Sequence, residues 1–193
     1  APTGLSAENA FEGVKLSWDE VAGAEEYVIY HKVGSGSYQE IARFEATETT
    51  YVHETATTGQ DNFYSVYARG GVTYSEPAEI SIRYLSAPTV KSITYANRTK
   101  SILLTWDKVS GASEYHVFRK ACGSTEWEFI GTSATNSYND YDVFHTNTYT
   151  YTVQAYYGDS CSSFDPVGKS FTLEISGVPT LDYISGDRWK CKV

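Results

Sequence analysis

Apolar and polar residues alternate along short segments of this chain, which is the pattern of half-buried β-strands. Val14, Leu16 and Trp18 are separated by polar residues, so all three would lie on one face of a strand. The same alternation returns at Ile102, Leu104 and Trp106. No segment repeats its apolar residues every 3.6 positions, as an amphipathic helix would. The pattern therefore predicts an all-β protein.

Turn-forming segments divide the alternating stretches into short strands. These segments are Gly34-Ser35-Gly36-Ser37, Gly70-Gly71, Gly123-Ser124 and Gly158-Asp159. The predicted strand centres lie near residues 5, 16, 29, 41, 51, 66 and 79, and then near 92, 104, 117, 129, 138, 153 and 171. Two sets of seven short strands favour antiparallel β-sandwiches.

An internal repeat supports the division into two sets, because the same motifs recur in the same order. Leu16-Ser17-Trp18-Asp19 recurs as Leu104-Thr105-Trp106-Asp107. The segments Val21–Tyr27 and Tyr64–Ala68 recur as Val109–Tyr115 and Tyr151–Ala155. We therefore predict two tandem seven-stranded sandwiches, over residues 1–85 and 86–176.

A third copy begins near the end of the chain, since Val178–Ile184 resembles Ala87–Ile93. We expect residues 177–193 to be the start of a truncated third repeat, with a private C-terminal extension as the alternative. The connectors on either side of the second unit are short and contain Pro88 and Pro179. A proline in so brief a link limits bending, so we expect a semi-rigid rod.

The order of these motifs resembles the fibronectin type III domain, and most closely the repeats of secreted or cell-surface bacterial proteins. A Trp closes the second strand, V-x-G-A-x-x-Y enters the third, and Y-x-V-x-A forms the sixth. The resemblance implies an immunoglobulin-like architecture. It also implies that Tyr64 and Tyr151 are tyrosine-corner residues, whose hydroxyls tie a strand to a preceding loop. The aromatic residues with predicted structural roles are Trp18, Tyr27, Tyr64, Trp106, Tyr115 and Tyr151.

Net charge, apolar runs and cysteine content give further expectations about partners and processing. A net charge of −9 argues against nucleic acid, because no basic cluster is available to replace phosphate counterions. No apolar run is long enough to insert in a membrane. The sequence has no Met and no signal peptide, so we expect a processed protein or a piece of a larger one. Cys122, Cys161 and Cys191 are interpreted as loop or buried thiols, with a Cys122–Cys191 disulfide as the alternative.

No motif for catalysis, a metal or a cofactor emerges from the sequence. The four histidines are scattered over different predicted strands and loops. Acidic pairs such as Asp19-Glu20, Glu25-Glu26 and Asp140/Asp142 fall at predicted turns, where no cleft is expected. We therefore predict a protein that is not an enzyme and has no cofactor.

Exposed aromatic residues are the candidates for binding. Strand alternation turns a set of rings outward on neighbouring strands, about 5 Å apart, where they would form a flat apolar band. The set comprises Tyr30, Phe63, Tyr67, His116, Phe118 and Tyr156. Such a band would stack on sugars or pack on another protein. The alternative is that the rings pair across strands and only stabilise the sheet.

These features favour a non-catalytic spacer in a larger extracellular or cell-surface protein, with neighbouring domains as its first partners and protein–protein adhesion as one role. The second hypothesis is a module that binds carbohydrate or protein through the exposed aromatics, accessory to a secreted polysaccharide-acting enzyme. A ligand, if any, would be an extracellular protein or polysaccharide.

Overall fold

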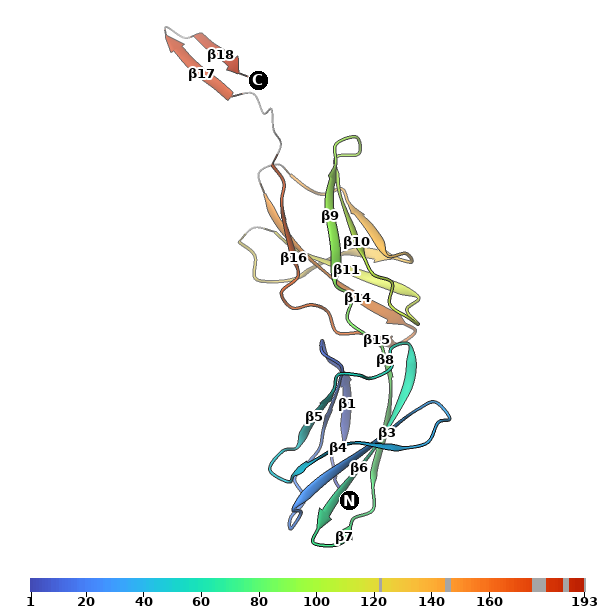
Figure 1. The fold of residues 1–193 in the computed structure, drawn as a ribbon. Helices are drawn as coiled ribbons and strands as arrows, with labels where there is room; N and C mark the ends of the chain where they lie inside the picture. The colour runs from blue at the N-terminus through green and yellow to red at the C-terminus, as the bar shows by residue number, and fades with distance from the viewer. Residues whose placement is uncertain (122, 145–146, 175–179, 186–187, 193) are drawn as a thin grey trace.

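The computed structural model describes residues 1–121, 123–144 and 147–174, together with the backbone of 180–185 and 188–192. All regular elements in these ranges are β-strands, and none of the described segments is a helix that could cross a membrane. The strands form two sandwiches that lie end to end (Figure 1). We call the sandwich of β1–β8 the first domain and that of β9–β16 the second domain.

The first domain packs a three-stranded sheet against a larger one. The order in the smaller sheet is β1 (Ser6–Asn9), β2 (Val14–Ser17) and β5 (Thr50–His53). The larger sheet runs β4 (Gln39–Glu45), β3 (Glu26–Val33), β6 (Gln60–Gly70) and β8 (Ala78–Tyr84). A short β7 (Thr73–Tyr74) forms a hairpin with the end of β6. All of these pairs are antiparallel.

The second domain repeats this arrangement. Its smaller sheet contains β9 (Val90–Ala96), β10 (Ser101–Trp106) and β13 (Ser137–Asp140). Its larger sheet contains β12 (Glu128–Ser133), β11 (Glu114–Ala121), β14 (Thr148–Tyr157), β15 (Ser160–Cys161) and β16 (Lys169–Thr172). Every predicted strand centre lies within a strand except the first, which lies one residue before β1. The prediction of two antiparallel sandwiches is confirmed.

Each domain has its own apolar core, built from the inward residues of its strands. Trp18 and Tyr27 meet edge to face with ring centroids 5.3 Å apart, and Trp106 and Tyr115 repeat this contact at 5.3 Å. Such pairs add about 0.5–1.5 kcal/mol to the energy of burial. Val28 departs from the simple alternation, because it is fully buried although it lies on the outer face of β3.

At the junction between the domains, two adjacent residues belong to different cores. Tyr84 packs in the first core, whereas Leu85 is fully buried in the second. The backbone N–H of Ser86 donates a 3.0 Å hydrogen bond back to the Thr58 hydroxyl of the first domain. The connector is therefore held by both domains.

Direct contacts reinforce this junction. The Asn9 side chain at the end of β1 donates a 2.8 Å hydrogen bond to the carbonyl of Cys161 in β15. The Arg83 guanidinium lies 4.2 Å from the centre of the Tyr157 ring. The backbones at Gly59 and Gly111 also approach closely, so that a Cβ built on Gly111 would be 2.6 Å from the Gly59 Cα. Glycine is required here because any side chain would push the domains apart.

The C-terminal strands β17 (Thr180–Ser185) and β18 (Arg188–Lys192) form an antiparallel hairpin. The first two strands of each domain pair in the same way. The assignment of residues 177–193 to a third repeat stays a prediction, and residues 177–179 lie outside the described ones.

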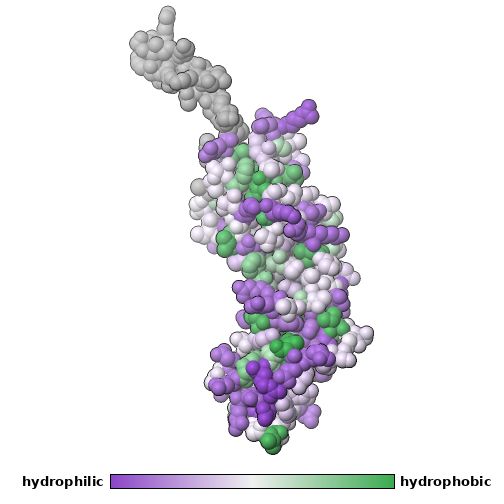
Figure 2. Space-filling model, viewed as in Figure 1, coloured by the Kyte–Doolittle hydropathy of each residue, from purple (hydrophilic) through white to green (hydrophobic). Residues whose placement is uncertain are grey.

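The remaining features are the distribution of hydrophobic residues on the surface and the state of the cysteines. On the face shown in Figure 2, hydrophobic residues form separate spots among hydrophilic ones. Cys161 is a partly buried free thiol. Cys122 and the side chain of Cys191 lie outside the described part of the chain, so the disulfide alternative stays untested.

Candidate functional site

Four tyrosines gather on the outer face of the larger sheet of the first domain. They surround a hollow of about 460 Å³ that we call the tyrosine hollow. Its lining residues are Tyr30, Tyr38, Ser65, Tyr67, Tyr74 and Glu79. Tyr30 on β3 lies opposite Ser65 on β6, which places it diagonally from Tyr67. Tyr74 comes from the β6–β7 hairpin and Tyr38 from the turn before β4.

The rings of the tyrosine hollow stand at right angles, so they do not form the flat band that the sequence predicted. Tyr30 and Tyr67 meet at 78° with centroids 5.6 Å apart, and Tyr67 and Tyr74 meet at 86° and 6.2 Å. Phe63 lies outside the hollow, where Lys32 Nζ is 5.3 Å from its ring. Edge-to-face contact is the lower-energy arrangement for neighbouring rings, which explains the difference.

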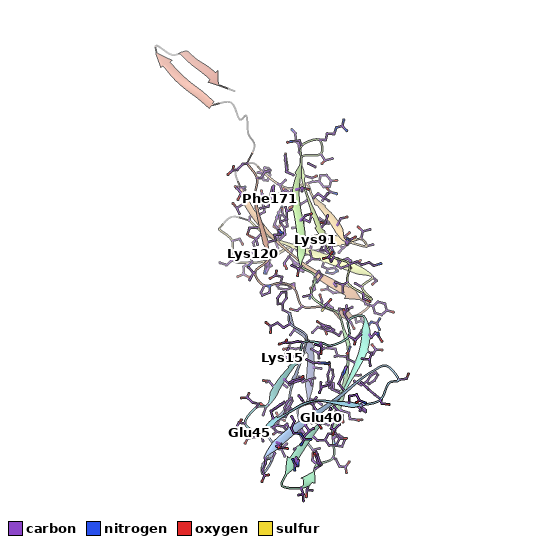
Figure 3. The ribbon with its side chains drawn as sticks, in the orientation of Figure 1. Lys15, Glu40, Glu45, Lys91, Lys120 and Phe171 are labelled. Atoms are coloured by element: carbon purple, nitrogen blue, oxygen red, sulfur yellow. The ribbon has the colours of Figure 1, made fainter. Side chains whose placement is uncertain are left out.

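Carboxylates border the tyrosine hollow. The Tyr30 hydroxyl donates a 3.3 Å hydrogen bond to Glu40 on β4, which is labelled in Figure 3. Arg43 holds Glu40 through two hydrogen bonds of 3.0 and 3.1 Å, and this lowers the pKa of Glu40. Burial and the charge of Glu40 raise the pKa of Tyr30. Burial and Glu79 likewise raise the pKa of Tyr38, so both phenols are neutral at ordinary pH.

The predicted binding residues of the second domain contact one another. His116 and Tyr156 stack with centroids 3.8 Å apart. Phe118 packs against Phe129 at 5.7 Å and against Phe164 at 5.9 Å. Phe164 belongs to residues 162–168, a longer link than residues 75–77 in the first domain. This cluster matches the alternative in which the rings stabilise the sheet; a binding role for it stays a prediction.

A buried polar cluster lies inside the first domain, and the sequence did not reveal it. The Tyr64 hydroxyl and His53 Nδ1 are joined by a 2.9 Å hydrogen bond. The His31 ring lies 4.5 Å from the His53 ring and is bonded through Nε2 to Asn62 Oδ1 at 2.9 Å. Burial, and then the proximity of His31, lower the pKa of His53 to about 4. These residues come from three strands, so their spacing in the sequence gave no signal.

The second domain places an ion pair at the equivalent positions. Arg119 stands where His31 does, opposite the sixth-strand tyrosine in register, and Asp140 stands where His53 does. Arg119 Nη1 donates to both Asp140 oxygens, at 3.0 and 3.2 Å, and Tyr151 donates to Oδ2 at 2.9 Å. Burial acts to lower the pKa of Arg119, but the bonds to Glu128 and Asp140 outweigh it and raise the pKa.

The acidic pairs at one end of the first domain line an open hollow of about 1090 Å³, which the sequence did not predict. Its carboxylates come from Asp19, Glu20, Glu25, Glu26 and Glu45. The hydrogen bond from Arg69 lowers the pKa of Glu26, whereas a general acid needs a raised one. Within the described ranges, no cluster of three or more acidic, His or Cys side chains is placed to hold a metal ion.

Three solved structures of fibronectin type III proteins are similar to this chain. A two-domain fibronectin type III segment of chicken tenascin is 18% identical with a TM-score of 0.47; the match covers 90% of this chain and 99% of that one. Chicken CNTN1 FN1–FN3 domains are 14% identical with a TM-score of 0.40, over 91% and 65%. A Fn3-like protein from Clostridium thermocellum is 31% identical over 43% of this chain and 90% of its own, with a TM-score of 0.39. The chain belongs to the fibronectin type III family.

No family model and no curated protein matches the chain as a sequence. The assignment therefore depends on the relative that is 31% identical over 90% of its own length, and on the repeated motifs. Both fibronectin type III domains keep the three-stranded and the larger sheet in the same strand order.

The structure corrects the position of the tyrosine corner in both fibronectin type III domains. Tyr149 has that role in the second, because its hydroxyl accepts a 2.8 Å hydrogen bond from the backbone N–H of Phe144. Asn62 is its equivalent in the first, bonded to both the N–H and the carbonyl of Thr57 at 3.1 and 3.0 Å. Tyr64 and Tyr151 lie two residues later. They point inward instead, to His53 and Asp140.

The other predicted structural aromatics lie in the cores. The Tyr27 hydroxyl accepts a 2.8 Å hydrogen bond from the Val21 backbone N–H, and Tyr115 accepts one of 2.9 Å from Val109. These bonds fix the loop that leads into the third strand of each fibronectin type III domain. Trp18 and Trp106 cover the same end of each core.

Proposed function

We propose that this tandem is a non-catalytic spacer that holds neighbouring domains of a larger extracellular or cell-surface protein at a fixed distance. The observation that carries the proposal is the junction, in which Leu85 is buried in the second core while Ser86 is bonded to the first domain. A linker that is bound to both domains fixes the orientation of one domain relative to the other, whereas a flexible linker does not. The similarity to a Fn3-like protein of Clostridium thermocellum supports a bacterial parent.

A pair of glycine variants tests the spacer. Gly59→Ala adds a Cβ that would lie 2.7 Å from the Ser110 carbonyl oxygen of the other domain. Gly71→Ala is the matched control, because it has a similarly positive φ (59° against 77°) but nothing within 4 Å. In small-angle scattering and residual dipolar couplings, we expect a fixed elongated particle for the wild type and for Gly71→Ala. Gly59→Ala should change the interdomain angle. A wild-type chain whose domains reorient freely would refute the proposal.

A second candidate role is ligand binding on the outer face of the first domain. The specific observation is the tyrosine hollow, which is lined by four tyrosine rings. An extracellular protein or polysaccharide would be the partner, as in adhesion or in an accessory module of a polysaccharide-acting enzyme. Pull-down and glycan-array binding should weaken in Tyr30→Ala and Tyr67→Ala but persist in Phe118→Ala. Equal binding by all three variants would remove this role.

A further inference from the structure

The walls of the tyrosine hollow suit one chemical class better than others. A sugar stacks on a ring whose face lies open along the surface, but here Tyr67 stands nearly perpendicular to both Tyr30 and Tyr74. Rings at these angles instead give the open hollow aromatic faces that point in more than one direction. A hollow with such aromatic faces attracts a positively charged alkylammonium group.

We propose that the tyrosine hollow binds an alkylated ammonium group, such as a quaternary amine on a ligand or a methylated amine on a polymer. The proposal rests on the second candidate role and is independent of the spacer. Ring faces carry the negative lobe of the aromatic quadrupole, so they favour a cation over a neutral group of equal shape. Alkyl substituents also suit the apolar tyrosine lining, because a methylated amine costs less to remove from water than a bare ammonium.

Glu79 provides the charge that this ligand needs. It lines the hollow from β8, with Oε1 3.5 Å from the Tyr38 hydroxyl. Among the described residues, no Lys or Arg side chain forms an ion pair with Glu79, whereas Glu40 is already neutralised by Arg43. The rings of this face already attract cations of the chain itself. Lys32 Nζ lies 4.6 Å from the Tyr38 centroid, and the Arg69 guanidinium lies 5.7 Å from that of Tyr74.

The second domain is an internal control. Phe118 takes the place of Tyr30 in register, but Gln154 replaces Tyr67 and Cys161 replaces Tyr74. Phe164 also packs on Phe118. The second domain therefore lacks the walls that Tyr67 and Tyr74 form in the first, and no binding of an ammonium group is expected there.

The test uses the whole chain and a matched pair of probes. Choline is titrated in parallel with 3,3-dimethylbutan-1-ol, its neutral isostere, while amide and tyrosine-ring shifts are followed by NMR at constant ionic strength. We expect saturable shifts at Tyr30, Tyr67 and Tyr74 with choline and binding at least about fivefold weaker with the alcohol, in line with cation–π energies. Tyr67→Ala should weaken choline binding by roughly tenfold and Glu79→Gln by roughly threefold. Phe118→Ala should leave it unchanged.

Three outcomes would overturn the proposal. They are equal affinity for choline and the alcohol, the absence of saturable shifts with choline, or choline shifts that persist unchanged in both Tyr67→Ala and Glu79→Gln. Glu79→Gln keeps the tyrosines in place, so the test does not depend on Tyr67→Ala folding normally. If an oligosaccharide shifts the same tyrosines while choline does not, the ammonium class is wrong but ligand binding at this face remains. The scattering experiment on the junction is unaffected by either result.

Discussion

The two domains place different chemistry at the same three interior positions. In the first domain these are His31, His53 and Tyr64, which form an aromatic set with ring centroids 4.5 to 5.7 Å apart. In the second domain they are Arg119, Asp140 and Tyr151, which form a buried ion pair capped by a hydroxyl. Only the tyrosine is common to both. The fold therefore requires that this hydroxyl be satisfied and leaves the identity of its partner free.

The outer faces of the two larger sheets differ in the length of the link that precedes the last strand. In the first domain β8 pairs with β6 as far as Ala78–Val66, and only three residues separate it from β7. In the second domain β16 begins later, opposite Tyr151, and the longer link before it delivers Phe164 onto the face. The longer link, together with Gln154 and Cys161 in place of Tyr67 and Tyr74, gives a packed cluster where the first domain has an open hollow, without changing the sheet.

The largest expected effect is in the interior of the second domain. Asp140→Ala leaves the Arg119 guanidinium buried without its main partner, so we expect the domain to lose about 3–5 kcal/mol of stability. Asp142→Ala is the control, because that carboxylate is exposed and 3.5 Å from Arg119, and it should cost less than about 1 kcal/mol. Urea unfolding followed by domain-specific NMR signals measures both. Similar losses of stability for the two variants would show that the buried ion pair stabilises the domain no more than the exposed carboxylate does.

Acid should destabilise the first domain selectively through His53. The folded pKa of about 4 lies below the ordinary value of 6.5, so the unfolded state binds more protons between these pH values. Stability from His53 is therefore complete above pH 6.5 and falls by up to about 3 kcal/mol as the pH drops to 4. The groups around His53 are His31, Tyr64, Tyr51 and Thr55.

The measurement is a set of urea unfolding curves from pH 7 to 4, with His53→Gln as the control. The variant lacks the titrating group. The difference between its curve and that of the wild type therefore separates the effect of His53 from that of carboxylates that titrate in the same pH range. If the first domain of both proteins responds identically to acid, His53 is not the source.

The smallest effects concern the corner residues. Tyr149→Phe removes the acceptor for the Phe144 N–H and should cost about 1 kcal/mol. Asn62→Ala should cost more, about 2 kcal/mol, because it leaves both backbone groups of Thr57 without this partner. Tyr157→Phe, at an exposed ring, should be neutral. Thermal unfolding of the three variants tests the assignment, and a larger loss from Tyr157→Phe than from Tyr149→Phe would contradict it.

Local patterns in the sequence were enough to predict the fold and its duplication. Alternation at Val14, Leu16 and Trp18 identifies the inward face of a strand because side chains follow the pleat with a period of two, whatever the partner strand is. All the predicted strand centres but the first lie within a strand, although the two-residue strands β7 and β15 were not predicted. These sequence patterns are local, or recur at a constant offset, so they can be recognised without knowing which strands pair.

Which side chains contact one another could not be predicted from such local patterns. The histidine pair, the Arg119–Asp140 ion pair and the walls of the tyrosine hollow each join residues from strands that are distant in the sequence. On β6, Asn62 forms the corner that was predicted for Tyr64, and the Tyr64 hydroxyl bonds to His53 instead. Alternation places both on the same face. Which of them reaches the loop depends on where β5 ends and how the chain crosses to the other sheet, and this is a property of the packed sandwich.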